Sequence, residues 1–444
     1  MKKILAGIIV LLIIAVLGLP FAKGWVAEQQ YRKTINEIND NYAKIGLDTK
    51  VEITRYTKGY ASSEIEWRLN LGKMKAVYGV EEILFYDQME HGWNSGLTEV
   101  VSRTNLVRNT WYKEFIAKKL DGKDPHHITN TYSQNGTITS SVIFDACTFT
   151  QDNQSIRLKP GQITMIADQG FKHFRYQGTW EGMMVDKTAQ INKVTLQSDL
   201  QRISPFVWAG NASFAVTDIR GEKEGEPPFS IAGFTINVTS QFNKNENTLS
   251  GLVEYGADSA AMGPQKVDKP FLGLALSGIN AQGYEQFMQQ YMVVIQTVMK
   301  DMEETQKGDS EQAKKALEQR MKAAGMQLLT AGEKLLTKGL RFDITDVHCT
   351  LAEGEISGKL NVWLNKDMTL AQFAPLLEQP AQALKIFSFR SWASLPEQLV
   401  SGTPQLFEPA FPGMKTGVFV IKDKRAEHRA EIKDGKLLLN DIEI

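Results

Sequence analysis

The stretch Glu64-Ile-Glu-Trp-Arg-Leu-Asn-Leu71 decides the fold of most of this chain. Polar residues alternate with apolar ones along it, and in an extended strand alternate side chains point to opposite faces. This two-residue period is typical of a β-strand with one sheltered and one solvated face. Because strands that are buried on both faces are apolar throughout, the stretch predicts an antiparallel sheet rather than a parallel one.

Short runs of the same kind recur on both sides of this stretch. Turn signals such as Asn135-Gly136 and Lys159-Pro-Gly161 separate them. Consecutive strands without helices between them favour an antiparallel arrangement. We predict strands at residues 51–56, 83–86, 97–104, 138–144, 155–158, 163–167, 174–180, 194–200, 213–219, 229–239, 248–255 and 271–277. Residues 49–280 should thus form a long curved antiparallel sheet or half-barrel with one sheltered apolar face.

A different period appears between residues 281 and 339. Apolar residues there recur at three- and four-residue steps, which is typical of amphipathic helices, and Gly308-Asp-Ser310 breaks the pattern. The segment predicts a helical hairpin packed against the sheet. Its first helix carries a stripe that is our candidate interface or groove: Tyr284, Met288, Tyr291, Ile295 and Met302. A methionine-rich face suits lipid or a second subunit, although such a stripe is more often core.

The C-terminal region, residues 340–444, again has the period of strands. We predict strands at residues 340–347, 358–364, 417–422, 426–432 and 435–440. Thr369 and Gln372 form a capping box, and Pro375 and Pro380 interrupt the helical pattern after it, so we predict short helices within residues 369–400. The fold class is therefore α+β, mainly β.

The N-terminal segment has the composition of a membrane span. Residues 4–22 carry no charged or polar side chain, and a helix of about 20 such residues crosses the hydrocarbon layer of a bilayer. We expect a transmembrane anchor over residues 1–23 and a juxtamembrane helix over residues 24–48. The alternative is a cleaved signal with its site at Ala22-Lys23-Gly24, but signal cores are shorter, about 7–15 residues.

The orientation of this anchor follows from the charges beside it. Lys2 and Lys3 precede the apolar run, and a short basic N-terminus usually stays in the cytoplasm. In a Gram-negative cell this predicts a single-pass inner-membrane protein whose body lies in the periplasm.

Composition limits the function classes further. The 444 residues carry a formal net charge of −1, which provides no basic field for nucleic acid. Cys147 and Cys349 fit no metal-binding spacing. In an oxidising compartment they could form one disulfide, and two buried thiols are the equally open alternative.

We find no motif that carries catalysis. The sequence contains no GxSxG, HExxH, Walker or Rossmann pattern. His126 and His127 form the only local histidine cluster. Adjacent histidines on a strand point to opposite faces and chelate poorly, so a solvated loop is the favoured interpretation. We predict no catalytic residue, no metal site and no cofactor, and we do not expect an enzyme.

Four stretches together resemble the YdgA family of Gram-negative envelope proteins, along the full length of the chain. They are Gly18-Leu-Pro20, Glu28-Gln-Gln-Tyr31, Arg55-Tyr-Thr-Lys-Gly-Tyr-Ala-Ser-Ser63 and Asp434-Gly-Lys-Leu-Leu-Leu-Asn440. The resemblance implies a self-associating inner-membrane protein of unestablished function. Its motifs are turns and strand starts, so no catalytic residue can be transferred.

These observations favour a non-enzymatic envelope protein whose sheltered face binds a lipid or another apolar ligand. The competing hypothesis is a scaffold or assembly factor that acts through protein contacts, for example as a homodimer through the helix at residues 31–45 or through the hairpin. An enzyme acting on cell-wall or lipid substrates is the third.

Overall fold

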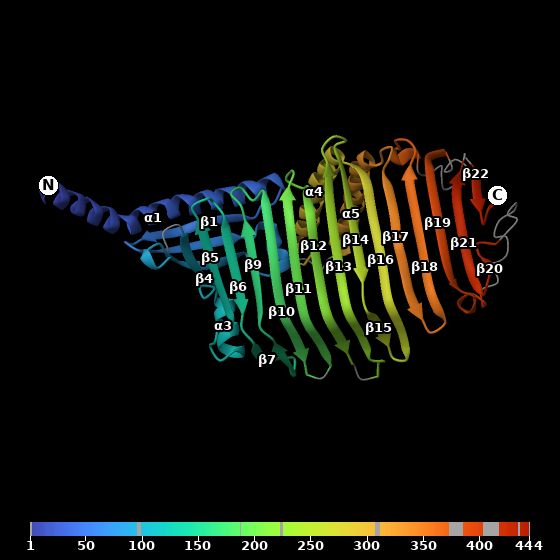
Figure 1. Ribbon diagram of the computed structural model, residues 1–444, viewed down its shortest axis with the longest axis horizontal. Coiled ribbons are helices and arrows are strands. Elements are labelled where there is room, and N and C mark those ends of the chain that lie inside the picture. The colour runs from blue at the N-terminus through green and yellow to red at the C-terminus, as the bar shows by residue number, and fades with distance from the viewer. Residues whose placement is uncertain are drawn as a thin grey trace. The chain divides into compact units, whose positions relative to one another are not determined.

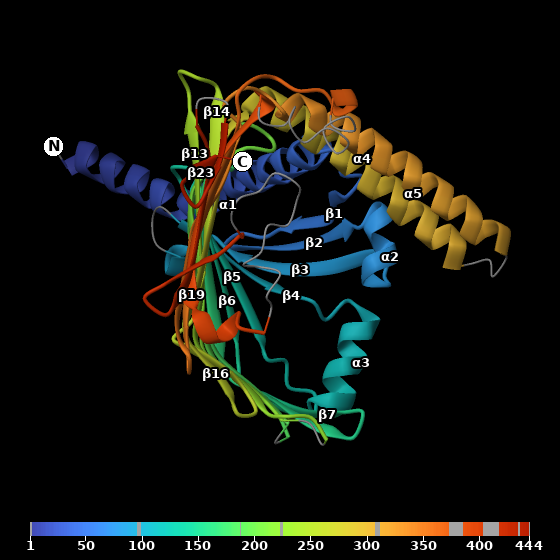
Figure 2. The same cartoon turned by 90° about the vertical axis from the view of Figure 1, so that its right-hand side faces the viewer.

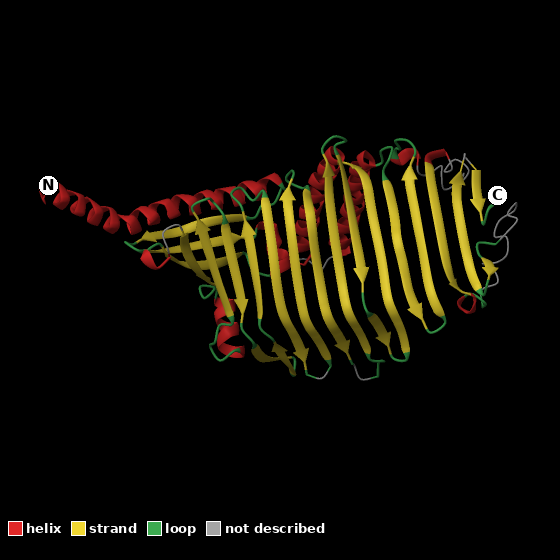
Figure 3. Ribbon diagram, viewed as in Figure 1, coloured by secondary structure: helices red, strands yellow, loops and turns green. Residues whose placement is uncertain are grey.

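The computed structural model describes residues 2–95, 99–186, 188–222, 225–306, 311–372, 385–402, 417–433 and 436–443. Within these residues antiparallel strands dominate, as the yellow arrows in Figure 3 show. The chain divides into two compact units: unit 1 comprises residues 1–180 and 295–320, and unit 2 comprises residues 181–294 and 321–444. The prediction of a mainly β chain with a long antiparallel sheet is confirmed.

Unit 1 begins with a long helix and continues as a strand meander (Figure 1). Its helices are α1 (Lys2–Lys44), α2 (Lys75–Tyr78) and α3 (Thr110–Lys119), with 3₁₀ turns η1 (Gly72–Met74) and η2 (Trp93–Ser95). Its strands are β1 (Lys50–Lys58), β2 (Ser62–Asn70), β3 (Glu82–Glu90), β4 (Glu99–Asn105), β5 (His126–Ser133), β6 (Ile138–Phe144), β7 (Cys147–Gln151), β8 (Gln154–Leu158), β9 (Gly161–Ala167) and β10 (His173–Val185), whose residues after Trp180 belong to unit 2. They pair in the order β1–β2–β3–β4–β5–β6–β9–β10, and β7 with β8 forms a hairpin.

The stretch that predicted the fold lies in β2. This strand pairs antiparallel with both β1 and β3. Ile65 is fully buried, and the Trp67 ring stacks on Phe85 with centroids 3.9 Å apart. Glu64, next to Ile65 in sequence, is exposed. The alternation of polar and apolar residues thus becomes the alternation of two sheet faces.

Helix α1 covers the apolar face of this first part of the sheet. Ala27, Tyr31 and Ile35 are buried on the helix, and they form one core cluster with apolar residues of the strands beneath them. The strand residues are Val51, Ile65, Met89 and Val100. The periodic stripe of residues 31–45 therefore packs inside unit 1. Of the two segments that the sequence suggested for self-association, the hairpin remains.

Two polar contacts fix α1 on the sheet. Tyr31 Oη donates to Asp87 Oδ2 over 2.7 Å. The Asn39 side chain accepts from Val51 N and donates to Val51 O, both at 2.8 Å. In this way Asn39 satisfies backbone groups of β1, which is paired on one side by β2. Unpaired strand edges invite aggregation, so the helix also protects this edge.

Asp87 is nearly fully buried, with 1% of its surface exposed. Burial raises the pKa of its carboxyl group, because a desolvated carboxylate is disfavoured; hydrogen bonds from Thr104 and Tyr31 act in the opposite direction. Desolvation and hydrogen bonding therefore act on the pKa of this buried acid in opposite directions.

Within the part of the chain that the structure describes, no helix combines the length and apolar character needed to cross a membrane. The side chains of residues 1–16 lie outside the described residues. The anchor over residues 1–23 thus stays a prediction. The helix expected from residue 24 onward is the continuation of α1, which runs through Pro20 and ends at Lys44.

Unit 2 is a longer meander with longer strands (Figure 1). Its strands are β11 (Ala189–Arg202), β12 (Trp208–Gly221), β13 (Phe229–Asn243), β14 (Thr248–Gly256), β15 (Ser259–Met262), β16 (Gln265–Asn280), β17 (Arg341–Leu351), β18 (Gly354–Leu364), β19 (Phe387–Pro396), β20 (Val420–Lys422), β21 (Arg425–Lys433), β22 (Lys436–Leu439) and β23 (Ile442–Glu443). The pairing order is β11–β12–β13–β14–β16–β17–β18–β19–β21–β22–β23, and every pair is antiparallel.

Two short strands complete this meander. β15 pairs with β13 and β16 beyond the end of β14, so β14 and β15 form one interrupted strand. At the interruption, Asp258 N donates to Ala232 O at 2.8 Å. β20 pairs with β21. Among the residues described between β11 and β16, no helix separates the strands, as the sequence predicted.

The predicted helical hairpin corresponds to α4 (Ala281–Gln306), α5 (Glu311–Gly332) and the 3₁₀ turn η3 (Glu333–Leu335). Residues 281–294 and 321–332 of these helices belong to unit 2. Near the base, Lys334 Nζ donates to Gln286 Oε1 over 2.6 Å. The predicted break at Gly308-Asp-Ser310 lies outside the described residues.

The prediction of short helices within residues 369–400 is partly wrong. Thr369 and Gln372 do form the expected cap, since Thr369 N donates to Gln372 Oε1 at 3.0 Å ahead of the 3₁₀ turn η4 (Leu370–Gln372). Residues 373–384 lie outside the described part of the chain. Phe387–Pro396, however, is strand β19, because β18 and β21 offer it backbone partners on both sides; the 3₁₀ turn η5 (Glu397–Leu399) comes directly after it.

Candidate functional site: an apolar sheet face

The strands of unit 2 carry an apolar face that is defined by their register. Directly paired residues in antiparallel strands point to the same face. One row of such partners crosses β12, β13, β14, β16, β17 and β18, and every member is apolar: Ala212, Val238, Val253, Leu274, Ile344 and Leu360. Six strands thus contribute to one continuous apolar line.

Rows on either side of this line extend the same face. Residues two positions along a regular strand again point to the same side; in β17 the step from Ile344 to Val347 is three residues, because the register shifts between them. The second row consists of Leu196, Phe214, Ile236, Tyr255, Leu272 and Val347. The third consists of Leu276, Phe342, Val362 and Phe389. From β11 to β19 the face extends over about 34 Å, at the usual strand spacing of about 4.8 Å.

The opposite face of the sheet carries a row of polar residues from β17 to β21. Asp343, Asn361, Arg390 and Glu431 are consecutive partners across β17, β18, β19 and β21. Asn361 Nδ2 donates to Asp343 Oδ1 at 2.7 Å, and Arg390 pairs with Glu431 over 3.2 Å. In this part of the sheet, hydrogen-bonded polar groups therefore line one side and hydrocarbon lines the other.

The apolar face is incompletely covered. Val238, Tyr255, Leu276 and Phe342 are 37%, 38%, 41% and 40% exposed. Exposing apolar surface costs about 25 cal/mol per Å², and a contiguous exposed apolar patch usually marks a binding surface. We define this surface, made of the three rows, as the apolar face.

The start of α4 closes one end of the apolar face. Val207, Leu249 and Ala281 are buried together there. Phe242, Ile279 and Tyr284 pack around them, and burial raises the pKa of the Tyr284 hydroxyl. Phe242 and Leu249 are cross-strand partners in β13 and β14. The helix thus packs on the end of the sheet.

A pocket of about 400 Å³ lies at this closed end. Its apolar lining includes Ile203, Val207 and Phe242, and its polar lining includes Asn247, Glu285 and Gln286. The pocket therefore combines hydrocarbon with carboxamide and carboxylate groups. Such a combination suits a ligand that has an apolar and a polar end.

The residues of the candidate stripe are distributed unevenly. Tyr284 and Met288 are half-buried, whereas Tyr291 is 38% exposed. Ile295 is half-buried and belongs to unit 1, and the side chain of Met302 lies outside the described residues. The structure therefore places only Tyr284 in the closed end of the apolar face.

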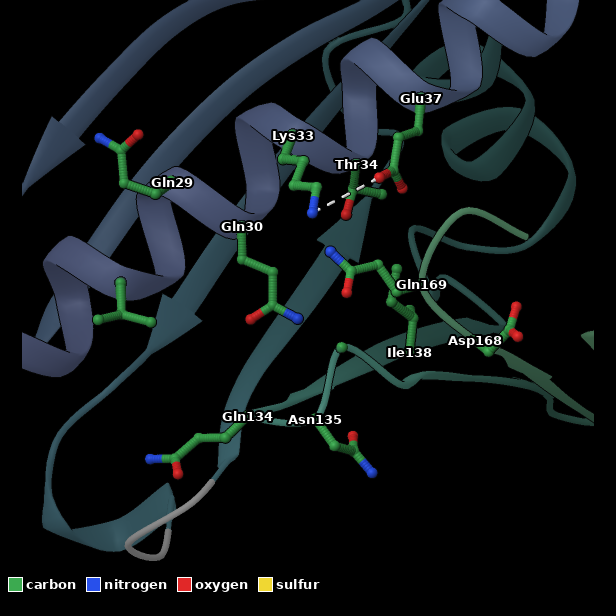
Figure 4. A pocket seen from close by; sticks show the side chains of 12 residues that line it. Gln29, Gln30, Lys33, Thr34, Glu37, Gln134, Asn135, Ile138, Asp168 and Gln169 are labelled. Atoms are coloured by element: carbon green, nitrogen blue, oxygen red, sulfur yellow. Dashed lines mark ion pairs between the residues drawn. The ribbon is translucent and has the colours of Figure 1, made fainter. Parts of the chain in front are cut away.

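A second pocket, of about 390 Å³, lies in unit 1 between α1 and two strand turns (Figure 4). Lys33, Thr34 and Glu37 of α1 face Gln169 across it in the figure. Gly170 N donates to Glu37 Oε2 at 3.1 Å, and Gln30 Nε2 donates to Ser133 O at 3.2 Å. These bonds fasten the strand turns to the helix.

The histidine pair behaves as its strand position requires. His126 and His127 are the first residues of β5, so the loop expected there is wrong. His126 Nδ1 lies 2.9 Å from Tyr112 Oη, and His127 Nε2 lies 2.8 Å from Asp145 Oδ2. The two rings thus bond to different partners. Among the residues described, no group of three or more histidine, cysteine or acidic side chains could hold a metal ion.

Both cysteines are free thiols in the structure. Cys147 begins β7 and Cys349 lies in β17. Each is partly buried, and desolvation raises the pKa of each thiol. Cys147 belongs to unit 1 and Cys349 to unit 2, so the two alternatives that the sequence left open, one disulfide or two thiols, both stay predictions.

Most residues that form the apolar face were not identified from the sequence as a site. The strand runs indicated a sheltered face, but the rows depend on register, which separate runs do not contain. The pocket residues Ile203 and Val207 lie in the β11–β12 turn, where no motif marked them.

The fold and the site define a two-faced antiparallel meander protein with an incompletely covered apolar face. A model of a family described as bacterial protein of unknown function (DUF945) matches residues 1–444, and the chain belongs to this family.

The chain is also similar to protein YdgA of Escherichia coli (strain K12), with 20% identity over 321 residues. The aligned part covers 67% of this chain and 63% of YdgA, somewhat less than two thirds of that protein. The family resemblance inferred from the sequence is thereby confirmed. No solved structure matches the chain.

Proposed function

We propose that this protein is a non-enzymatic, inner-membrane-anchored envelope protein that shelters the acyl chains of a lipid, or of another apolar ligand, on the apolar face of unit 2. The observation that carries the proposal is the set of three apolar rows, several of whose members stay more than a third exposed. The body would lie in the periplasm.

Acyl chains suit this face for two reasons. Its side chains are almost all hydrocarbon, so they offer dispersion contacts but few hydrogen-bond partners. It is also far longer than wide: three rows two residues apart cover about 13 Å along the strands. The curved sheet predicted from the sequence would shelter such chains further. The closed-end pocket, with Asn247 and Gln286 in its lining, suits the polar end of the same molecule.

The anchoring half of the proposal rests on the N-terminal sequence. Residues 4–22 are wholly apolar and follow Lys2 and Lys3. Helix α1 continues from this run into the core of unit 1 through Tyr31 and Ile35. A tether of this kind would keep the apolar face close to the membrane from which its ligand comes.

The test is to extract the full-length chain from membranes with a mild detergent and identify bound lipid by native mass spectrometry. A spin-labelled fatty acid added to the purified chain then reports on mobility. We expect co-purifying lipid and an immobilised nitroxide. A chain that carries no lipid and leaves the probe freely tumbling would refute the proposal.

A second candidate is a homodimeric scaffold or assembly factor that acts through protein contacts. Exposed apolar side chains on the unit 2 part of the helices favour it: Tyr291, Val293, Met321, Met326 and Leu329, between 38% and 61% exposed. Met326→Glu in the full chain, followed by native mass spectrometry, tests it. A folded monomer from a dimeric parent would support the scaffold, and an unchanged oligomeric state would count against this surface.

A further inference from the structure

Large exposed aromatic side chains gather at one end of unit 1. Phe21 and Trp25 on α1 are 53% and 55% exposed, Tyr60 in the β1–β2 turn is 54% exposed, and Trp93 in η2 is 46% exposed. Three separate segments of the chain therefore contribute them. We call these four residues the aromatic collar.

The β1–β2 turn is attached to α1 at the level of the collar. Tyr60 Oη donates to Leu17 O. Lys58 Nζ lies 5.4 Å from the centroid of the Phe21 ring, a cation–π geometry. The same ammonium group pairs with Glu28 over 3.2 Å. Tyr60 is thus held beside the helix rather than extended into solvent.

The η2 turn is attached to the same part of α1 by Lys23. Lys23 is 8% exposed, and its Nζ donates to Gly92 O at 3.1 Å and to Ser95 Oγ at 2.9 Å. Trp93 lies between these two acceptors in the sequence. The turn that carries the exposed Trp93 is therefore fixed next to the helix segment that carries Phe21 and Trp25.

His91 completes the attachment. Its ring is fully buried, and Nδ1 lies 3.0 Å from Pro20 O while Nε2 lies 3.0 Å from Ser63 Oγ. A carbonyl oxygen can only accept, so Nδ1 carries the proton and donates. Gly24 makes room for the ring, because a Cβ there would lie 2.4 Å from His91 Cε1. The helix is therefore fixed against the sheet where the collar begins.

We propose that the aromatic collar is a membrane-contact surface, so that unit 1 rests in the interfacial layer of the bilayer instead of standing on a flexible stalk. The inference rests on the anchor in the proposed function. It adds that Tyr60 and Trp93, which lie far from the apolar run in sequence, also touch lipid.

Two observations support a lipid surface as the partner of the collar: its continuity with the apolar run on α1, and the chemistry of its side chains. The part of the collar on α1 begins with Phe21, inside the uncharged run of residues 4–22, and ends with Trp25, just after it. Tryptophan and tyrosine favour the headgroup level, because their rings are apolar with one polar atom. Phe21 and Trp25 are about 6 Å apart along a helix axis, and the interfacial layer on each side of a bilayer is also about 6 Å thick.

The structure supplies matched control residues at the other end of the same strands. Tyr78 in α2 is 57% exposed and Trp111 in α3 is 46% exposed, close to the values for Tyr60 and Trp93. Figure 2 shows α2 at the end of β2 and β3 opposite to the β1–β2 turn. Nine-residue strands such as β2 place these ends about 30 Å apart.

The experiment uses the full chain reconstituted into phosphatidylethanolamine–phosphatidylglycerol vesicles that contain a photoactivatable lipid. Labelled peptides are mapped by mass spectrometry after irradiation. We expect label on residues 4–25 and on the peptides that contain Tyr60 and Trp93, with at least several-fold less on those that contain Tyr78 and Trp111.

Each other outcome has a distinct meaning. Label on residues 4–25 alone would overturn the collar and leave the anchor intact. Label nowhere would overturn both. If Tyr60 and Trp93 take no lipid label, and a bifunctional crosslinker in a parallel sample joins two chains at these residues, the collar belongs to an interface with a second copy and the proposal is overturned.

A second measurement tests the same inference without photolabelling. Brominated lipids quench tryptophan fluorescence at short range. Trp93→Phe should lower the quenchable share of the emission, whereas Trp111→Phe should leave that emission in place. Equal effects of the two substitutions would contradict the inference.

Discussion

Val238 and Thr239 are neighbours in β13, yet their side chains lie on opposite faces of the unit 2 sheet. Val238 pairs with Ala212 and Val253 in the apolar face. Thr239 pairs with Asn211 and donates a 3.0 Å hydrogen bond to its Oδ1. One step along the chain therefore separates the hydrocarbon side from the hydrogen-bonded side.

Gly24→Ala should loosen α1 from unit 1. The added methyl group would overlap the His91 ring, which Pro20 and Ser63 hold from both sides. Overpacking of this kind costs about 1–3 kcal/mol. Gly18→Ala is the control, because nothing lies within 4 Å of a Cβ at that position of the same helix. Thermal unfolding should show a lower midpoint for the first variant only, and equal midpoints would argue against the close packing.

Stability should decrease on mild acidification because of His91. Burial lowers the pKa of its imidazole below the ordinary value of 6.5, so the unfolded chain takes up a proton at a higher pH than the folded chain does. The stabilisation is complete above pH 6.5 and is lost as the pH falls toward the folded pKa. His91→Gln should flatten this part of the unfolding profile between about pH 7.5 and 5. A profile as steep as that of the parent would show that a group other than His91 causes the loss of stability.

The contribution of Asp87 to stability should depend on pH in the opposite direction to that of His91. Burial raises the pKa of its carboxyl group, so its contribution is complete below the unfolded value of 3.8 and is lost as the pH rises through the folded value. Asp87→Asn keeps an acceptor for Tyr31 and removes the charge. At neutral pH it should unfold at a higher denaturant concentration than Asp87→Ala, which leaves the tyrosine hydroxyl unpaired at a cost of about 1–3 kcal/mol. Identical midpoints would show that the Tyr31–Asp87 bond contributes little.

Local alternation predicted the strands well wherever it was strong. β2 and the strands β11, β12, β13, β14 and β16 follow from their period, although the structure makes most of them longer, whereas the short strand β15 was missed. β5 was missed because His126–Ser133 is largely polar. β19 was missed because the capping residues and prolines just before it favoured helices. The partners that decided β19 are β18 and β21, and a local pattern does not contain them.

The candidate sites depend on contacts between distant segments. The apolar face arises when register aligns Val238 with Val253 and Leu274. The collar forms because the Tyr60 hydroxyl bonds to Leu17 O of α1, and because Lys23 of α1 bonds to the carbonyl oxygen just before Trp93. A sequence pattern detects amphipathic strands and an apolar run, but it does not show which of them meet, because turn geometry and tertiary packing set those contacts.

The most direct test of the lipid-binding proposal compares Val238→Asp with Thr239→Asp in the full-length chain. Both positions are partly exposed in the same strand, so both substitutions place a carboxylate at the same level on opposite faces. Lipid that co-purifies with each variant is measured by native mass spectrometry, with circular dichroism as the check of folding. The account predicts that Val238→Asp loses most of the bound lipid and Thr239→Asp retains it. Equal lipid content in two folded variants would contradict binding on the apolar face.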